Sequence, residues 1–261
     1  MIHNTAMFYD VHRLIGTLCL GALLVTVPRG TYRGPVDPKA PDFRAYPAGE
    51  ARKEAFFEYL APLIDAENEL WRARRARLEG LRDRTLNKAD RRWLKALAGF
   101  FEVSPDLPKN RLIDALLDHV DTVPRSLALA QAAKESAWGT SRFTREGNNY
   151  FGQRCYEKGC GMIPRHRPSG AIYEVRRFDS AEDSVASYLY NINSHLEYAN
   201  LRDYRSRQRD SGREVSGIRA AETITQYSER RQAYVDEIQS LIHFNDLDDV
   251  DEPVEPEPSA Y

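Results

Sequence analysis

The centre of the chain carries the stretch Leu127-Ala-Leu-Ala-Gln-Ala-Ala-Lys-Glu135-Ser-Ala-Trp138-Gly139. Its alanines and leucines predict a helix that packs closely against an apolar neighbour. Pro124 stands where a first helical residue is expected, and Gly139 is placed to end the helix. We therefore expect Glu135 in the last turn of a buried helix.

The position of Glu135 predicts a raised pKa. Unpaired carbonyls at a helix C-terminus disfavour a carboxylate. Trp138, three residues on, is placed to share a face with Glu135 and to desolvate it. A carboxyl group that stays protonated near neutral pH is what a glycosidase uses to protonate a leaving oxygen. The alternative is a solvated surface glutamate at a helix end, the usual fate of this residue type.

A loop rich in glycine and asparagine follows the helix, Gly147-Asn-Asn-Tyr-Phe-Gly152. We expect it to line a groove beside Glu135, with rings stacking on sugar faces and amides binding N-acetyl groups. The alternative is a turn whose asparagines bond to the backbone. Gln131, one helical turn before Glu135, is placed to orient it. The predicted substrate-binding residues are Gln131, Trp138, Asn148, Asn149, Tyr150 and Phe151.

Together the two motifs resemble the signature of the glucosaminidase domain, glycoside hydrolase family 73, which includes the FlgJ-type peptidoglycan hydrolases. The resemblance covers about residues 50–245 and is closest to the Bax-like branch of Gram-negative bacteria. It implies a lysozyme-like fold, cleavage of the N-acetylglucosamine–N-acetylmuramic acid backbone of peptidoglycan, and Glu135 as catalytic acid. The likeness continues in Phe178-Asp-Ser180, Ser184-Val-Ala-Ser-Tyr188, Asn191-Ile-Asn-Ser-His195 and Tyr227-Ser-Glu-Arg-Arg-Gln-Ala-Tyr234-Val.

The second catalytic group is ambiguous in this sequence. Many members of the family carry a second Glu on a hairpin, but this chain is shorter there and lacks their Thr-Glu-Tyr pattern. Glu174 is the best remaining acid and Glu157 the second, although Glu174 could equally be a strand residue paired with Arg176. The acetamido group of the substrate could also serve as nucleophile. By the resemblance Tyr227 contacts sugar or orients the attacking species; otherwise it is a core tyrosine.

Two other interpretations stay open beside a glucosaminidase. A lytic transglycosylase also uses a lone Glu followed by Ser, and closes the sugar's 6-hydroxyl onto the anomeric carbon. A peptidoglycan-binding or scaffold module without activity would need no second carboxylate. The resemblance implies no metal and no organic cofactor, and no motif points to nucleic acid.

The N-terminus predicts export. An apolar run, Leu14–Val27, follows His12 and Arg13, and has the length of a signal-peptide core rather than of a membrane span. We expect residues 1–30 to be a signal peptide or an inner-membrane anchor, and the protein to be periplasmic in a Gram-negative bacterium. Cys155 and Cys160 are spaced for a small disulfide loop, which an oxidising periplasm permits. Two free buried thiols are the alternative, and a zinc site is weaker because only His166 lies nearby.

Charge is unevenly distributed along the chain. The formal net charge is −2, but residues 246–261 carry seven acids and no base. Removing these seven from the 39 acidic residues leaves 32 against 37 basic residues, a net charge of +5. A positive body suits a polymer that bears carboxylates, as peptidoglycan stem peptides do. Ordinary surface charge is the equal alternative.

These patterns predict an α+β, mainly α protein: a lysozyme-like domain with a small β-hairpin beside the groove. We expect a linker at 31–49 and a domain at 50–245, with an N-terminal helical part (50–122) and a catalytic core (123–245). An acidic, disordered tail at 246–261 follows. The expected helices span about 50–84, 89–101, 111–119, 180–193, 214–226 and 230–242, with a strand at 172–177.

Overall fold

A computed structural model of the chain describes residues 40–248 and 251. The predicted export signal at 1–30 lies outside the described residues, as do residues 31–39 of the linker and residues 249–250 and 252–261 of the tail. Within the described part, no helix is both long and apolar enough to cross a membrane.

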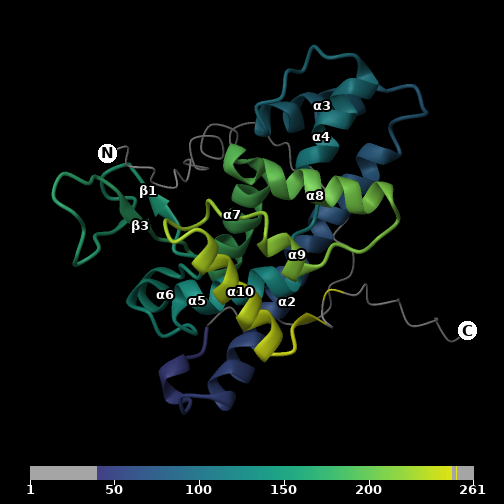
Figure 1. Cartoon of the computed structure of the whole chain (residues 1–261). Helices are drawn as coiled ribbons and strands as arrows, with labels where there is room; N and C mark the ends of the chain where they lie inside the picture. Colours follow the sequence, from purple (N-terminus) through teal and green to yellow (C-terminus); the bar gives the residue numbers. More distant parts are fainter. Residues whose placement is uncertain (1–39, 249–250, 252–261) are drawn as a thin grey trace, which may run out of the picture.

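Helices form most of the described chain, and a small antiparallel sheet completes it, which confirms the mainly α, α+β class (Figure 1). The helices are α2 (Glu50–Glu79), α3 (Lys88–Phe100), α4 (Lys109–His119), α5 (Arg125–Ser136), α6 (Arg142–Gly147), α7 (Ala181–Ser194), α8 (Ala199–Asp210), α9 (Gly217–Ala221) and α10 (Gln232–Phe244). Two 3₁₀ turns, η1 (Phe43–Ala45) and η2 (Leu196–Tyr198), and three strands complete the order.

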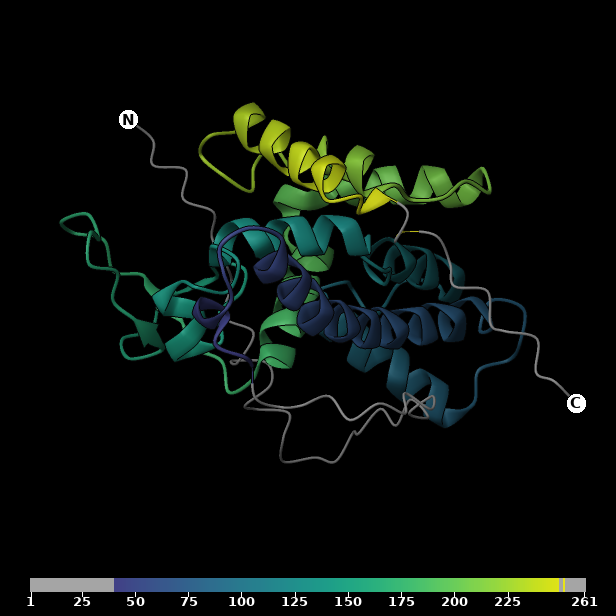
Figure 2. The ribbon, with the colours of Figure 1, turned by 90° about the horizontal axis from the view of Figure 1, so that it is seen from below.

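The alanine-rich helix α5 lies at the centre of the molecule. It packs against α2 on one side and against α9 and α10 on the other, so that Figure 2 shows it between those layers. All of its residues from Ser126 to Ala133 are buried, as the sequence predicts. Alanine side chains are short, so neighbouring helices approach closely and hold α5 rigidly from both sides.

The N-terminus of α5 is capped from the far end of the chain. Its own N-cap residue, Pro124, offers no side-chain acceptor. Asp251 supplies one instead: Oδ1 accepts from the Ser126 amide at 2.9 Å, and Oδ2 accepts from the Gly217 amide at 2.9 Å. One carboxylate thus satisfies amides at the starts of α5 and α9. Leu247 is buried as well, so the packed body extends beyond residue 245.

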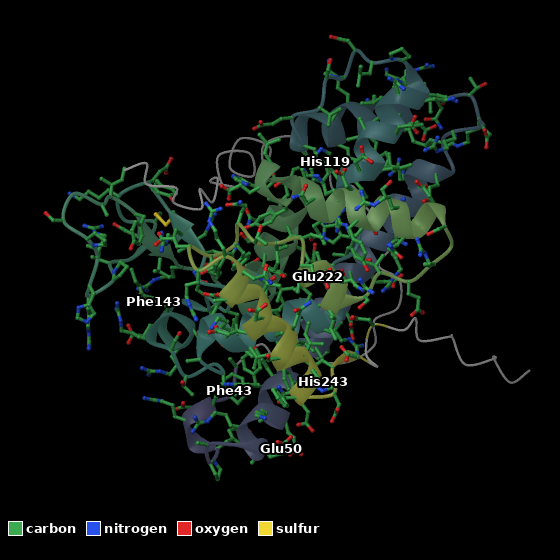
Figure 3. The ribbon with its side chains drawn as sticks, in the orientation of Figure 1. Phe43, Glu50, His119, Phe143, Glu222 and His243 are labelled. Carbon is green, nitrogen blue, oxygen red and sulfur yellow. A yellow bond between two sulfur atoms is a disulfide. The ribbon has the colours of Figure 1, made fainter. Side chains whose placement is uncertain are left out.

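The sheet holds three strands rather than the predicted two-stranded hairpin. Its strands are β1 (Arg154–Cys155), β2 (Gly161–Met162) and β3 (Glu174–Arg176) in the order β1-β3-β2, all antiparallel. The predicted disulfide joins Cys155 to Cys160 across the loop between β1 and β2, with Cα atoms 6.2 Å apart, and appears as the yellow bond in Figure 3.

An aromatic cluster fixes the turn that follows α5. Phe43 lies beside the N-terminal end of α2 (Figure 3) and packs edge-on against Phe56, with ring centroids 5.4 Å apart. A Cβ at Gly139 would lie 2.1 Å from Cδ2 of Phe43, so only glycine fits there. Its φ of +75° is a second reason for glycine.

Helix α8 is an element that the hydrophobic pattern does not predict. Its buried residues are Leu201, Arg202 and Arg205, so the buried side is mostly cationic. Arg209 adds a bidentate pair to the buried Asp121. Guanidinium groups with carboxylate and carbonyl partners replace the apolar stripe that periodicity detects.

Candidate active site

Glu135 lies in the last turn of α5, where the helix ends in unusual backbone. The helix stops at Ser136, and Ala137 and Trp138 follow with left-handed φ values of 51° and 56°. Non-glycine residues adopt this conformation at a cost of about 1–2 kcal/mol each. Packing of the flanking segments holds the strained turn, which directs the chain away immediately after Glu135.

Trp138 does not share a helical face with Glu135, and that part of the prediction is wrong. The i, i+3 relation requires a continuous helix, and α5 ends before Trp138. The indole packs edge-on against Phe56 and Phe57, with centroids 5.8 and 5.4 Å away. Sugar binding by Trp138 stays a prediction.

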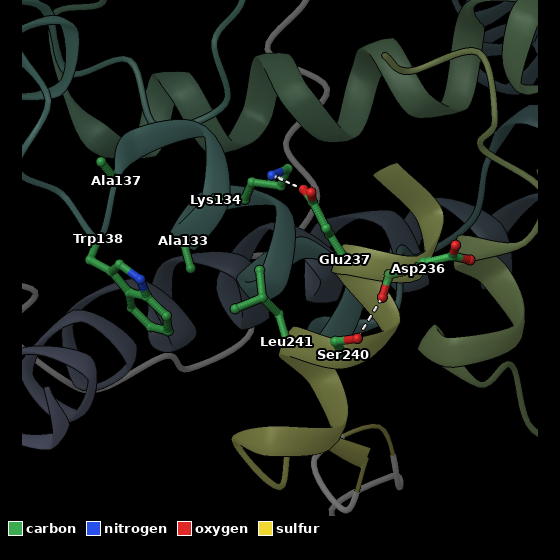
Figure 4. A pocket seen from close by; sticks show the side chains of 8 residues that line it. All are labelled: Ala133, Lys134, Ala137, Trp138, Asp236, Glu237, Ser240 and Leu241. Atoms are coloured by element: carbon green, nitrogen blue, oxygen red, sulfur yellow. Dashed lines mark hydrogen bonds and ion pairs between the residues drawn. The ribbon is translucent and has the colours of Figure 1, made fainter. Parts of the chain in front are cut away.

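Trp138 lines a hollow of about 480 Å³ between the end of α5 and helix α10. Figure 4 shows Lys134 and Glu237 paired at one side of this hollow and Trp138 at the other. Glu135 is not among its lining residues, so the hollow is separate from the carboxyl group. The lining residues are Ala133, Lys134, Ala137, Trp138, Asp236, Glu237, Ser240 and Leu241.

Gly152 brings the glycine- and asparagine-rich loop directly onto Glu135. A Cβ at Gly152 would lie 3.0 Å from Oε2 of Glu135, and the residue has a φ of +66°. Both facts require glycine, because a side chain would press on the carboxyl group and strain the backbone. The loop therefore approaches the acid through its backbone.

The two asparagines of this loop form its internal scaffold. Asn148 is the left-handed cap of α6, and its Nδ2 donates to the carbonyls of Phe178 and Asp179 at 3.1 Å each. The Asn149 side chain is buried, donates to the Gln153 carbonyl at 2.8 Å and accepts from the Gln153 amide at 3.1 Å. These bonds match the predicted alternative, a turn stabilised by asparagine. Contact of either amide with sugar stays a prediction.

The two rings of the loop face the protein interior. Tyr150 and Phe151 are 0% and 1% exposed. Phe151 stacks on Tyr188, with centroids 3.9 Å apart and an interplanar angle of 8°. Their burial anchors the loop to α2 and α7, whereas stacking on sugar stays a prediction for both.

A chain of hydrogen bonds leads through the core to Glu135. The Tyr188 hydroxyl donates to Oε1 of Gln131 at 2.6 Å, and Nε2 of Gln131 donates to the Tyr234 hydroxyl at 3.0 Å. Because Tyr234 accepts from Gln131, its own proton is directed to the carboxyl group of Glu135, with which it is hydrogen-bonded. Gln131 thus orients Tyr234, and Tyr234 in turn orients Glu135.

Burial raises the pKa of Glu135, as the sequence predicts. Desolvation is the largest effect, and it outweighs the Tyr234 hydrogen bond and the positive charges of Lys134 and Arg154, which all lower the pKa. Glu135 as a residue is half-buried rather than fully enclosed. A partly accessible acid with a raised pKa is suited to donate a proton and then to persist as a hydrogen-bonded carboxylate.

Tyr227 lies behind this arrangement. Its hydroxyl donates to the Phe151 carbonyl at 3.0 Å, and its ring stacks on Tyr234 with centroids 5.4 Å apart. The side chain is 7% exposed. It therefore ties α10 to the loop that approaches Glu135, and a direct catalytic role stays a prediction.

Glu174 is buried in β3 and holds the disulfide loop. Its two carboxylate oxygens accept from the amides of Gly159 at 3.0 Å and of Gly161 at 2.8 Å. These bonds lower the pKa of Glu174, and Arg167 and Lys158 lower it further. Both oxygens are therefore engaged within the loop, and a role as catalytic base stays a prediction that the geometry does not favour.

The residue-level prediction missed several members of the site. Tyr188 and Tyr234 belong to motifs that carry the family resemblance, but only the fold shows that they meet at Gln131. Gly152 closes the loop motif, and its positive φ explains the residue type. Within residues 40–248 and 251, no group of three or more His, Cys, Asp or Glu side chains could hold a metal ion.

Comparison with known proteins agrees with this architecture. The family profile described as mannosyl-glycoprotein endo-beta-N-acetylglucosaminidase, the glucosaminidase family, matches residues 113–247. Protein bax of Escherichia coli (strain K12) is 32% identical over 200 residues, which cover 74% of this chain and 70% of that protein. No solved structure was found to match. The profile covers α5, the glycine- and asparagine-rich loop and α10, so this chain belongs to the glucosaminidase family.

Proposed function

We propose that this protein is a peptidoglycan hydrolase that cleaves the β-1,4 glycan backbone as an N-acetylglucosaminidase, with Glu135 as general acid. One observation carries the proposal: a half-buried glutamate with a raised pKa, hydrogen-bonded to Tyr234 and approached by the backbone at Gly152. Glycosidases require such a group to protonate the glycosidic oxygen as the bond to the anomeric carbon breaks.

Tyr234 supports both halves of the proton transfer. Before transfer it fixes the rotamer of the Glu135 side chain. After transfer it donates to the new carboxylate, whose charge is also stabilised by Lys134 and Arg154. The environment thus raises the pKa through burial and keeps enough donors nearby to accommodate the product anion.

The substrate's own acetamido group is the proposed nucleophile. Glu174, the best second acid in the sequence, is already bonded to Gly159 and Gly161. The acetamido oxygen would attack the anomeric carbon as Glu135 protonates the departing oxygen, giving an oxazolinium ion. Water would then open that ring and return its proton to Glu135, with net retention of configuration.

A lytic transglycosylase is the second candidate. It is favoured by the engagement of both Glu174 oxygens with backbone amides, because closing the sugar's 6-hydroxyl onto the anomeric carbon needs no separate water-activating base. A module that only binds peptidoglycan is a third, since it also needs no second carboxylate. The raised pKa of Glu135 argues against this last candidate, because a protonatable buried acid is costly to keep without use.

Fragments released from purified peptidoglycan separate these candidates. The products of the wild-type protein and of Glu135→Gln would be reduced with borohydride and analysed by mass spectrometry. Reduced N-acetylglucosamine ends that are absent with Glu135→Gln are the expected result. Anhydro-muramic ends would identify a transglycosylase, and binding without fragments would identify a non-catalytic module.

We also propose that the protein is exported to the periplasm, either freed from its N-terminal segment or anchored by it in the inner membrane. The Cys155–Cys160 disulfide supports this, because such bonds persist in oxidising compartments. Protease accessibility in spheroplasts tests the proposal: digestion without lysis is expected, and protection until lysis would contradict it.

A further inference from the structure

Arg154 stands close to Glu135 and belongs to the small sheet. It opens β1 and comes two residues after Gly152, which lies against the Glu135 carboxyl group. Two residues span at most about 7 Å, so the Arg154 backbone is near that carboxyl group. The positive charge of Arg154 also lowers the pKa of Glu135. A cation is therefore built in beside the proposed acid.

The guanidinium of Arg154 packs against an aromatic ring. It lies over the ring of Tyr173, 4.1 Å from the centroid. The Tyr173 carbonyl accepts from Arg167 at 3.1 Å, and Arg154 pairs with Val175 across the sheet. A planar guanidinium that rests on a ring keeps its edge N–H groups available for a carboxylate in the same plane.

The charge of Arg154 is not neutralised within the lobe formed by residues 142–177. Oε2 of Glu146 lies 3.6 Å from Nη1 of Arg142, so Glu146 pairs with Arg142. Glu174 accepts from the backbone amides of Gly159 and Gly161 and also interacts with the charge of Arg167. Among the described residues, no carboxylate forms an ion pair with Arg154 within 4.0 Å. The charge is thus available to a ligand.

The lobe around Arg154 is basic as a whole. Residues 142–177 contain eight Lys or Arg and three Asp or Glu, a net charge of +5, while the complete chain carries −2. A concentrated positive potential attracts polyanions and speeds their encounter. This potential would not attract neutral glycans such as chitin.

We propose that Arg154 is a specificity-determining residue that binds a carboxylate of the stem peptides, so that the enzyme prefers acidic, peptide-bearing glycan strands to neutral ones. The inference rests on the proposed function and adds the substrate class. Peptidoglycan stem peptides carry free carboxylates beside the glycan backbone, and a guanidinium can offer two parallel donors to one of them. The preference would arise from Arg154 itself rather than from the net charge of the lobe.

Chemical amidation of the substrate tests this directly. Soluble peptide-bearing glycan strands would be treated with carbodiimide and ammonia, which turns carboxylates into carboxamides and leaves the sugars unchanged. Cleavage of native and amidated strands would be compared for the wild-type protein, Arg154→Gln, Arg154→Lys and the control Arg91→Gln. Arg91 is exposed on α3, so its replacement changes the net charge equally, far from the sheet (Figure 1). Rates would be taken at each variant's optimum pH, since loss of Arg154 also changes the pKa of Glu135.

The expected result is a roughly tenfold lower kcat/KM of the wild-type protein on amidated strands, the scale of one charge-assisted hydrogen bond. Arg154→Gln is expected to be about tenfold slower on native strands and nearly indifferent to amidation. Arg154→Lys should keep part of the preference, and Arg91→Gln should keep all of it. Equal slowing of Arg154→Gln on both substrates, or a wild-type protein indifferent to amidation, would overturn the inference while leaving the hydrolase intact.

Binding provides the readout that separates this inference from the proposed function. If the wild-type protein released no fragments, the hydrolase proposal would fail, and sedimentation with native and amidated sacculi would decide the role of Arg154. Stronger pelleting with native sacculi that is lost in Arg154→Gln would support the inference. Equal pelleting with both sacculi would overturn it.

Discussion

Replacing Tyr234 by phenylalanine removes the hydrogen bond that the proposed acid receives and leaves the ring in place. A hydrogen bond to a charged group contributes about 1.5–3 kcal/mol. Loss of this bond destabilises the Glu135 carboxylate relative to the protonated acid, so it should raise the pKa of Glu135 further. The direction follows from the structure, because Tyr234 is the strongest effect that lowers the pKa of Glu135.

The pH dependence of kcat/KM on peptidoglycan measures this change. The free enzyme must hold Glu135 protonated, so activity falls as the pH rises through its pKa. In Tyr234→Phe that alkaline limb should move to higher pH, while the maximal rate falls because the product carboxylate is less stabilised. Gln131 also loses its acceptor, which should reduce the free energy of unfolding by about 1–3 kcal/mol in urea titrations.

Tyr198→Phe is the matched control. Tyr198 is equally buried, and its hydroxyl bonds to Asn191 rather than to Glu135. We expect a similar loss of stability without movement of the alkaline limb. An alkaline limb that stays in place in Tyr234→Phe, or moves to lower pH, would refute the assignment of Tyr234 as the donor to Glu135.

Four further predictions concern the loop, the sheet, the disulfide and the nucleophile. Gly152→Ala should reduce activity at least tenfold, because its Cβ would meet Oε2 of Glu135 at 3.0 Å. The control Gly170→Ala, also at positive φ but in open space, should reduce only stability. Equal activity of the two variants would contradict the contact between Gly152 and Glu135. Glu174→Gln should lower the melting temperature by weakening the amide bonds of the disulfide loop; a thousandfold loss of kcat with unchanged melting would instead make it the base. Reduction of the Cys155–Cys160 bond should destabilise the protein by about 2 kcal/mol, seen as a lower melting temperature with dithiothreitol. A thiazoline analogue of the oxazolinium ion should inhibit competitively, and failure to inhibit would remove the acetamido group as nucleophile.

The sequence predicts the helix of Glu135 well because its signals are local. Alanine spacing, Pro124 and Gly139 place α5 within one or two residues of Arg125–Ser136. The raised pKa is also predicted, but partly for the wrong reason. The left-handed turn at Ala137 and Trp138 takes Trp138 out of the helix, and no propensity indicates such a turn at non-glycine residues.

The remaining features depend on contacts between distant segments. Periodicity overlooks α8 because Arg202 and Arg205 occupy its buried side. The roles expected of Asn148 and Asn149 in sugar binding could not be weighed from sequence, since the carbonyls they bind lie up to 31 residues away. Likewise, residues 188 and 234 meet on Gln131 only after α7 and α10 have packed around α5.

The Asp251 cap has a consequence for the order in which the protein matures. The helix that presents Glu135 starts at Arg125, yet the acceptor for its Ser126 amide arrives 125 residues later. During synthesis, α5 lacks this acceptor until residue 251 has emerged. Completion of the capped helix therefore depends on a segment far downstream of it. A protein organised in this way reaches its final form only after the segment around Asp251 has docked, so chains that end before this segment differ from the finished protein at the helix that carries Glu135.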